Sequence, residues 1–212
     1  MTAGQHRAWE RSWERWGVDV MELPEGPLDT AGWFGRAAPV VLEIGSGMGE
    51  STAAMALDTP ELHHLAVEVY QPGLAQLLLR IEQAGITNLR LLRGDAYLVL
   101  REHLTAGGLH AVRIYFPDPW PKRRHHKRRL VNPELVALVA SRLAPGGTLH
   151  LATDWEPYAQ EMLEAGTAEP ALRNTSTGDT FTPRPSWRPV TKFEQRARDE
   201  GRVVRDLLFT RV

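Results

Sequence analysis

Six of eight consecutive residues in the middle of the chain are lysine or arginine, and the other two are histidine, over Lys122–Arg129. The whole chain has a formal net charge of −1, so this positive charge is concentrated locally. A local basic stripe is typical of a surface that binds a polyanion. If all six cations contacted phosphates, binding would weaken with salt along a log–log slope of roughly −4 to −5. The alternatives are a solvated loop or a localisation signal, although the internal position disfavours a disordered tail.

The basic block directly follows the segment Phe116-Pro117-Asp118-Pro119-Trp120-Pro121. An acid and an indole at the edge of a cationic surface indicate that the polyanion is presented to a chemical site. Trp120 could stack on a flipped-out base or pack beneath the loop, and both interpretations are equally favoured. His125 and His126 are expected to contact phosphates and not a metal ion, because no histidine or carboxylate stands at ligand spacing from them.

A second candidate site is the glycine-rich sequence Glu43-Ile44-Gly45-Ser46-Gly47-Met48-Gly49. Glycines let the backbone turn tightly and approach a ligand closely, so Gly45 and Gly47 are candidate cofactor-binding residues. The third glycine comes one position too early for the Gly-x-Gly-x-x-Gly pattern of dinucleotide-binding folds. The Glu43 carboxylate would repel a pyrophosphate but would favour the ammonium and sulfonium groups of S-adenosylmethionine. The loop therefore favours S-adenosylmethionine over a nicotinamide dinucleotide.

Two further acids stand where a cofactor of this kind would need them. Glu68 is expected at the end of the second strand, where a carboxylate can accept both ribose hydroxyls. Asp95, after Arg93-Gly94, is placed to receive the adenine amino group. Each acid has a simpler interpretation, a surface acid for Glu68 and a helix N-cap for Asp95. Taken together with Glu43, they favour a class I methyltransferase site.

Strand-like and helix-like segments alternate from residue 40 onward. This alternation predicts βαβ crossovers and a mostly parallel sheet with helices on both faces, which is a Rossmann-like α/β fold. The expected strands are 40–44, 64–69, 89–92, 111–116, 148–152, 171–177 and 203–211. The expected helices are 51–57, 72–83, 96–101, 133–143 and 155–164.

The acids of both candidate sites follow the ends of expected strands. In parallel sheets of this kind, ligands bind beyond the carboxyl ends of the strands. We therefore expect five carboxylates to gather along one edge of the sheet: Glu43, Glu68, Asp95, Asp118 and Asp154.

The first 35 residues do not fit the alternation. Trp9, Trp13 and Trp16 recur at i, i+4 and i+7, which places them on one face of a helix. Docking of this face on the main domain is favoured over stacking on exposed bases. Residues 24–39 are rich in proline and glycine and are typical of a linker. We expect an N-terminal helical and linker extension over residues 1–38 and a methyltransferase domain over residues 39–212.

The bulk composition restricts the class of protein. A chain of 212 residues can bury a full core as one domain. The absence of cysteine excludes disulfides and cysteine-based metal or nucleophile chemistry. The N-terminus lacks the apolar stretch of a signal peptide, and no run of about 18 apolar residues occurs, so no membrane span is expected. We expect a cytoplasmic protein.

Four motifs together closely resemble the bacterial tRNA (guanine-N7-)-methyltransferase family, over roughly residues 39–212. The Pro-Asp-Pro-Trp segment that runs into the basic block and the late Thr-Lys-Phe-Glu sequence are highly specific, whereas the glycine loop is not. The resemblance implies a sheet of seven strands with an antiparallel last strand, and methyl transfer from S-adenosylmethionine to N7 of a guanine in the tRNA variable loop. The motifs are Val41–Glu50, Phe116–Lys122 with the basic block, Ala152–Tyr158 and Thr191–Glu194.

The resemblance also implies roles for individual residues. Asp118 would be the catalytic residue and, with Glu43, Glu68 and Asp95, would contact the cofactor. The residues near the substrate guanosine would be Lys122, Asp154, Thr191, Lys192 and Glu194. The RNA contacts would be Arg124, His125, His126, Lys127, Arg128 and Arg129. Ser46 departs from the family pattern, which has a bulky aromatic residue in the glycine loop.

Two of these motifs also have the form of a helix capping box, Thr153-Asp154-Trp155-Glu156 and Thr191-Lys192-Phe193-Glu194. From the residues alone, a cap is the favoured interpretation of both. An antiparallel last strand begins at the ligand edge, so Thr191 and Glu194 could cap a helix and face the pocket at the same time.

The chemistry implied by the resemblance needs no strong general base, because N7 of guanine has a free lone pair. We interpret Asp118 as an electrostatic and positioning group that accepts from N1–H and the exocyclic amine of guanine. Two other classes remain, a nicotinamide-dependent dehydrogenase and a non-catalytic RNA-binding protein. Glu43 and the glycine spacing disfavour the first, and the complete set of acids disfavours the second. No obligatory protein partner is expected, and the chain would act as a monomer or homodimer.

Overall fold

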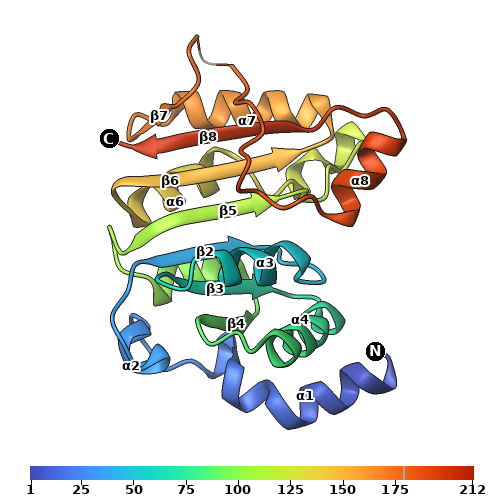
Figure 1. Ribbon diagram of the computed structural model, residues 1–212. Helices are drawn as coiled ribbons and strands as arrows, with labels where there is room; N and C mark the ends of the chain where they lie inside the picture. Colours follow the sequence, from blue (N-terminus) through green and yellow to red (C-terminus); the bar gives the residue numbers. More distant parts are fainter. Residues whose placement is uncertain (179) are drawn as a thin grey trace. The chain divides into compact units, whose positions relative to one another are not determined.

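The computed structural model describes residues 1–178 and 180–212, which form two units, Met1–Thr105 and Ala106–Val212. Each unit has its own strands and its own covering helices (Figure 1). Among the helices of the described residues, none combines the length and apolar character needed to cross a membrane.

Unit 1 contains a four-stranded parallel sheet in the order β1-β4-β3-β2. Strand β2 consists mainly of valine, leucine and isoleucine, and nearly every residue of β2 and β3 is buried, as is typical of parallel strands covered by helices. The strands are β1 (Gly17–Asp19), β2 (Val40–Ile44), β3 (His63–Glu68) and β4 (Leu89–Arg93).

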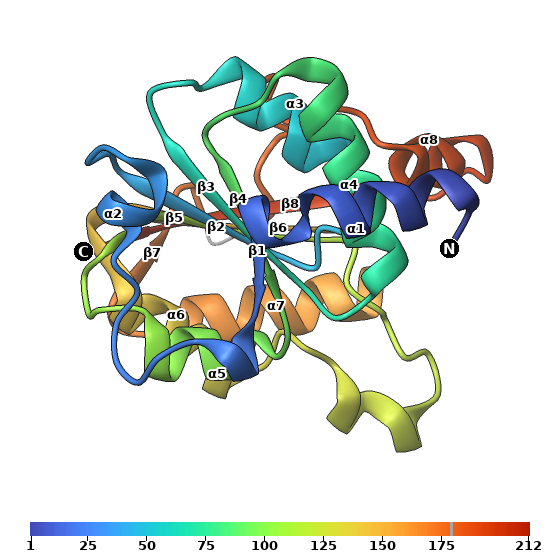
Figure 2. The same cartoon turned by 90° about the horizontal axis from the view of Figure 1, so that it is seen from below.

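The helices of unit 1 begin and end where local sequence signals stand. Pro72 lies in the first turn of α4, and Gly85 ends it in the left-handed conformation with φ 65°. Figure 2 shows α3 and α4 on one face of this sheet and α5 on the other. The helices are α1 (Ala3–Trp16), a 3-10 turn η1 (Val20–Glu22), α2 (Thr30–Phe34), α3 (Glu50–Asp58), α4 (Gln71–Ala84), α5 (Ala96–Leu98) and a π-helical turn η2 (Val99–His103).

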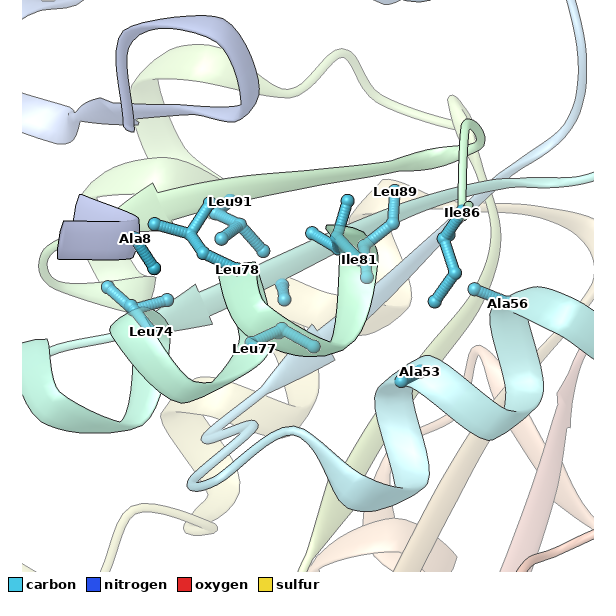
Figure 3. Close-up of a cluster of buried hydrophobic side chains, with 11 residues drawn as sticks. Ala8, Ala53, Ala56, Leu74, Leu77, Leu78, Ile81, Ile86, Leu89 and Leu91 are labelled. Carbon is cyan, nitrogen blue, oxygen red and sulfur yellow. The ribbon is translucent and has the colours of Figure 1, made fainter. Parts of the chain in front are cut away.

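A leucine-rich cluster joins the helices of unit 1 to its sheet. Figure 3 shows residues of α4 pointing toward β4 on one side and toward α3 on the other. Burying each leucine contributes about 1.5–3 kcal/mol. Trp9, Trp13 and Trp16 of α1 pack against this cluster, and the rings of Trp9 and Trp13 stack with centroids 4.0 Å apart. The docking interpretation of the three tryptophans is therefore the one that the structure supports.

In unit 2 the strands lie side by side in the order β5-β6-β8-β7. β5 and β6 are parallel, whereas β8 is antiparallel to both of its neighbours. Figure 2 shows α6 and α7 on one face of this sheet, and Figure 1 shows α8 near the carboxyl ends of β5 and β6. The elements are β5 (Leu109–Tyr115), a 3-10 helix η3 (Arg123–Arg128), α6 (Pro133–Arg142), β6 (Leu143–Thr153), α7 (Glu156–Ala168), β7 (Leu172–Asn174), α8 (Lys192–Asp199) and β8 (Arg205–Arg211).

The predicted mostly parallel α/β fold with an antiparallel last strand is confirmed, but the strand count is corrected. The described residues form eight strands and not seven, because β1 also pairs with β4 through Gly17, Val18 and Asp19. A strand of three residues is too short to show the alternation by which strands are recognised in a sequence. The stretch 24–39, expected to be a linker, contains α2. The domain boundary at residue 38 stays a prediction.

Candidate active site

The glycine loop after β2 keeps its backbone open to a ligand. Gly45, Gly47 and Gly49 all have positive φ angles, 79°, 54° and 70°, which side chains rarely tolerate. A Cβ added at Gly45 or Gly47 would meet no atom within 4 Å, so there is space above the loop. At Gly49 a Cβ would clash with Leu77 of α4, so this glycine serves packing.

Helix α4 supports the loop from one side. A Cβ at Gly73 would clash with the carbonyl oxygen of Gly47, so only glycine lets the helix approach this closely. Arg80 Nε donates to the Met48 carbonyl oxygen at 3.1 Å. The shape of the loop therefore depends on two positions of α4 as well as on its own glycines.

The Glu68 carboxylate ties the loop to the end of β3. Its Oε2 accepts from the Gly47 amide at 2.8 Å, and its Oε1 accepts from the amides of Val69 and Tyr70 at 2.7 and 2.9 Å. An ionised carboxylate has about four acceptor sites, so about one is left for a ligand hydroxyl. The structure therefore adds a role that sequence reasoning missed, because Glu68 fixes the glycine loop through the Gly47 amide.

Glu43 lies on β2 just before the glycine loop, and Ser46 is part of the loop. The Glu43 side chain on β2 is buried, with the residue 5 % exposed. Ser46 is 8 % exposed, and its hydroxyl has no hydrogen-bond partner among the described residues. A buried hydroxyl without a hydrogen-bond partner is unfavourable unless a ligand group supplies that hydrogen bond.

Asp95 caps a helix, which is the simpler of the two interpretations of this residue. It is the N-cap of α5, and its Oδ1 accepts from the Tyr97 amide at 2.8 Å. The residue is exposed, and a cap uses only part of the acceptor capacity of a carboxylate. The cap therefore leaves a cofactor contact open.

The five predicted acids fall into two groups. Glu43, Glu68 and Asp95 lie at or just beyond the carboxyl ends of β2, β3 and β4, which are neighbours in the sheet of unit 1. Asp118 and Asp154 follow β5 and β6, which are neighbours in unit 2. The expected gathering at strand ends is seen within each unit, and the convergence of both groups on one site stays a prediction.

The segment around Asp118 is conformationally strained. Phe116 and Trp120 have φ angles of 50° and 44°, and they are the residues other than glycine with positive φ in the described chain. The Phe116 amide donates to the Ala152 carbonyl oxygen at 2.8 Å. Asp118 is exposed, and its carboxylate has no hydrogen bond or ion pair with any described residue. Both oxygens of Asp118 are therefore open to an external partner.

Most of the basic block forms an exposed surface on η3. The Arg128 guanidinium lies 4.9 Å from the ring centre of Trp120, and the His125 ring stands perpendicular to that ring with centroids 5.9 Å apart. Packing of Trp120 beneath the block is therefore seen. The exposed cations of the block are Lys122, Arg123, Arg124, Lys127 and Arg128.

Arg129 is the exception within the block. It is 4 % exposed, its Nε donates to the Pro119 carbonyl oxygen at 2.8 Å, and it forms an ion pair with Glu161 of α7 at 2.6 Å. Its guanidinium also lies 4.8 Å from the ring centre of Tyr158. Because this guanidinium is used inside the protein, we do not include Arg129 in the RNA-facing surface.

Of the residues predicted near the substrate, Asp154 directly follows β6, and Thr191, Lys192 and Glu194 lie at the start of α8. The Asp154 carboxylate forms an ion pair with Arg202 at 3.0 Å. The cap expected at Thr153 is wrong, because the N-cap of α7 is Trp155 and has no side-chain cap bond. The cap expected at Thr191 is seen, since its hydroxyl accepts from the Glu194 amide at 3.2 Å. Lys192 is exposed at the start of α8.

Glu194 is buried among arginine side chains. It is 0 % exposed, and its carboxylate bonds to Arg184 at 2.7 Å, to Arg188 at 2.5 Å and to Arg198. Its side chain therefore does not close the second half of the capping box or present an acceptor to a substrate.

Arg188 stands at the centre of a buried network that sequence reasoning missed. Its guanidinium binds both oxygens of Asp206 on β8, at 2.8 and 2.9 Å, in addition to Glu194. His150 of β6 joins Asp206 at 2.8 Å through Nε2 and the Tyr115 hydroxyl at 2.8 Å through Nδ1. No local spacing in the sequence indicates this network, because its members lie on separate elements.

Burial shifts the protonation of this network. Burial lowers the pKa of His150 below its ordinary value, although the hydrogen bond to Asp206 opposes the shift. Burial alone would raise the pKa of Asp206, but hydrogen bonds from His150 and Arg188 outweigh it, and the pKa falls. The network therefore holds a neutral imidazole beside an arginine–carboxylate pair. The described residues contain no group of three or more His, Cys, Asp or Glu side chains that could hold a metal ion.

Comparison with solved structures supports the fold. The crystal structure of the 16S rRNA methyltransferase KamB is 17 % identical, covers 92 % of this chain and 98 % of its own, and has a TM-score of 0.59. The aminoglycoside resistance methyltransferase NpmB1 is also 17 % identical, covers 82 % of this chain and 87 % of its own, and has a TM-score of 0.54. At this identity the likeness concerns the fold alone.

Comparison of sequences gives the family. A family model described as "Putative methyltransferase" matches residues 37–207. A tRNA (guanine-N(7)-)-methyltransferase of Streptomyces coelicolor is 52 % identical and covers 100 % of this chain and 78 % of the relative. The proteins of the same name from Nitrosomonas eutropha and Bordetella pertussis are 49 % and 52 % identical, covering 98 % and 100 % of this chain and 90 % and 81 % of the relatives. At this identity over the whole length, the chain belongs to the tRNA (guanine-N(7)-)-methyltransferase family.

Proposed function

We propose that the protein methylates N7 of a guanine in the variable loop of tRNA, with S-adenosylmethionine as the methyl donor. One observation carries the proposal beyond family membership. Asp118 is an exposed carboxylate without an internal partner, on a strained segment that runs directly into five exposed cations. A free acceptor next to a polyanion-binding surface is what recognition of a base within a nucleic acid requires.

Unit 1 has polar groups that suit the binding of this cofactor. The glycine loop offers open backbone, Ser46 offers a buried hydroxyl without a partner, and Glu68 keeps acceptor capacity. Glu43 and Asp95 supply further negative charge, which suits a ligand with an ammonium and a sulfonium group and disfavours one with a pyrophosphate. When bound, S-adenosylmethionine supplies an electrophilic methyl group.

Unit 2 has the groups that would select and orient guanine. The Asp118 oxygens can accept from N1–H and the exocyclic amine, a donor pair that only guanine presents in that arrangement. N7 has no proton to lose, so the carboxylate acts by orientation and by stabilising the positive charge that the ring acquires. Asp118 is therefore a catalytic residue that takes no proton in the methyl step.

The exposed cations of the basic block would hold the tRNA backbone. With Arg129 left out, five cations remain, and the log–log salt slope of tRNA binding is expected to be roughly −3.5 to −4.5. Replacing one of them with alanine, for example Arg124, should reduce the magnitude of that slope by about one. We expect the purified chain to act without a partner subunit, as a monomer or homodimer, in the cytoplasm.

The decisive experiment is incubation of the purified chain with methyl-labelled S-adenosylmethionine and a tRNA transcript. The modified base is then mapped by borohydride and aniline cleavage, which is specific for N7-methylguanosine. A transcript with 7-deazaguanosine at the target position is the matched control, because it keeps the Watson–Crick edge and lacks N7. Label in the control, or label that aniline does not cleave, would contradict the proposal. Thermal stabilisation by NAD and not by S-adenosylmethionine would favour the dehydrogenase alternative.

A further inference from the structure

The position of Asp118 must come from its neighbours in the chain. Its carboxylate makes no hydrogen bond or ion pair with a described residue, so no side-chain contact orients it. An acid that must offer both oxygens to a base cannot be fixed through those oxygens. The backbone on either side must therefore be held in place by other groups.

On the upstream side the holding group is Arg188. Its guanidinium lies 5.8 Å from the ring centre of Phe116, which is two residues before Asp118 and has the unfavourable φ of 50°. Arg188 is itself 1 % exposed and bonded to Asp206 and Glu194 through all three of its nitrogens. Because the Arg188 guanidinium is fixed by these bonds, its favourable contact with the Phe116 ring restricts the position of that ring.

On the downstream side the holding group is Arg129. Its Nε donates to the carbonyl oxygen of Pro119, the residue directly after Asp118. The guanidinium is anchored in turn by Glu161 and lies against the ring of Tyr158. The side chain of Arg129 is 2 % exposed, whereas that of Glu161 is 44 % exposed, so the arginine is the buried member of the pair.

We propose that Arg129 and Arg188 are positioning residues, which hold the segment Phe116–Trp120 from both sides and thereby orient Asp118 for methyl transfer. The proposal rests on the function proposed above and gives Arg129 a different role from the RNA contact that its place in the basic block suggests. Neither arginine touches the substrate. Both act through the backbone that carries the catalytic carboxylate.

The conservative variants Arg129→Lys and Arg188→Lys test the proposal because they keep the charge but lose the planar fork of donors. Arg129 contacts Pro119 and Glu161 through two different nitrogens, and Arg188 binds Asp206 through two, whereas a lysine has only one nitrogen at its end. Each variant is expected to lower the single-turnover methylation rate about 10- to 100-fold, since small misplacements of reacting groups cost this much. Equilibrium dissociation constants for tRNA and S-adenosylmethionine are expected to change less than about twofold, and the salt slope is expected to stay unchanged.

Two arginines of unit 2 serve as matched controls. Arg205 pairs with Glu156, also on α7, at 2.7 Å, and Arg196 of α8 pairs with Glu200 at 2.8 Å. Both are at least partly exposed, and neither is seen in contact with the Phe116–Trp120 segment or with Arg129 and Arg188. Arg205→Lys and Arg196→Lys are expected to methylate at nearly the wild-type rate.

A second pair of variants covers the case in which a lysine variant fails to fold. Phe116→Leu removes the ring but leaves the ion pairs of Arg188, and Glu161→Gln removes the anchor of Arg129 at a half-exposed position. Each is expected to lower the rate in the same direction without weakening tRNA binding. Exchange of the Phe116 amide, which is bonded to Ala152, gives a readout that is independent of activity and should become faster in Arg188→Lys.

The outcomes separate the two roles of Arg129 clearly. Loss of tRNA affinity and a smaller salt slope in Arg129→Lys, with an unchanged single-turnover rate, would make it an RNA contact and overturn the proposal. Unchanged rates and unchanged Phe116 exchange in Arg188→Lys would overturn it for Arg188. If the wild-type chain made no N7-methylguanosine, the proposed function would fail on its own, and Phe116 exchange would still decide whether Arg188 holds the segment.

Discussion

The glycine loop and the Phe116–Trp120 segment hold their acids in opposite ways. Glu68 accepts from three backbone amides within its own surroundings, and the glycines let the loop close around it. Asp118 is bonded to no described residue, and two buried arginines contact its chain neighbours instead. Glu68 therefore uses most of its acceptor sites within the protein, whereas both oxygens of Asp118 stay open, as the proposed contact with guanine would require.

This difference matches the roles proposed for Glu68 and Asp118. Binding a ribose hydroxyl needs about one open acceptor site, so the others can stabilise a loop. In the proposed reaction, the two donors of guanine would occupy both oxygens of Asp118, so the groups that fix this acid would have to contact its chain neighbours and not its carboxylate. Charged anchors are more costly to bury than backbone amides, which explains why Arg188 has two carboxylate partners.

The largest expected effect comes from Asp118→Asn. Asparagine has one acceptor oxygen, presents an NH2 donor in place of the other, and carries no charge to stabilise a positive ring, so the single-turnover rate should fall about 10²- to 10³-fold. The tRNA dissociation constant should change less than about twofold. Asp199→Asn on α8, which removes an exposed carboxylate paired with Gln195, is the control. Near-normal turnover in the Asp118 variant would show that the open carboxylate is not the catalytic group.

Glu68→Gln tests the other side of the comparison. Glutamine has only one acceptor oxygen and would point an amino group at one of the backbone amides, so both the loop and the cofactor contact should suffer. The dissociation constant of S-adenosylmethionine, measured by calorimetry, should rise about tenfold or more, because hydrogen bonds to charged groups contribute about 1.5–3 kcal/mol. Exposed Glu61, just before β3, provides the control Glu61→Gln. An unchanged affinity would remove Glu68 from the cofactor site.

Two glycine variants separate loop geometry from general packing. Gly73→Ala would clash with the Gly47 carbonyl in unit 1, and Gly166→Ala would clash with the Phe209 ring in unit 2. Each should lower the free energy of unfolding by about 1–3 kcal/mol in urea titrations. Only Gly73→Ala should also weaken S-adenosylmethionine binding, and equal weakening in both would mean that the loop is not specifically involved.

Because the buried network of unit 2 contains titratable groups, the free energy of unfolding should depend on pH. Because the pKa of His150 is lowered in the folded protein, the unfolded chain binds more protons, and stability falls as pH drops below about 6.5. His63 in unit 1 shifts in the same direction, mainly through burial that lowers its pKa, so a variant is needed to isolate His150. His150→Gln should remove up to about 1.4 kcal/mol per pH unit from the slope of unfolding free energy.

The acid range provides a check on this assignment. The pKa of Asp206 is lowered, so its contribution to stability is present above about pH 3.9 and is lost at lower pH. The two transitions should therefore be separate in wild-type protein. A His150→Gln variant with the wild-type slope between pH 6.5 and 5 would contradict the assignment.

The sequence predicted the parts of the site that local patterns encode. The glycine loop, the acids at strand ends and the caps at Asp95 and Thr191 depend on residues within a few positions of one another. The fold class followed from the alternation of strands and helices. The convergence of unit 1 and unit 2 acids on one site stays a prediction.

The parts that the sequence did not predict depend on distant residues or very short elements. Arg188 and Asp206 are 18 positions apart, and His150 and Asp206 are 56 apart, so no spacing rule joins them. Arg129 has the same type as its exposed neighbours in the basic block, and only burial distinguishes it. Strand β1 was missed because three residues carry no periodicity.

The placement of α1 and β1 bears on how the chain can be shortened. Strand β1 covers the outer side of β4 with three residue pairs, and Asp19 at its end is bound to Arg93 at 2.7 Å. Without residues 1–22, β4 would become an open edge, and the leucine face of α4 would lose Ala8 and three indoles. Such a truncated chain would be prone to aggregate through edge-to-edge pairing, so fusion partners and affinity tags are better attached at the other terminus.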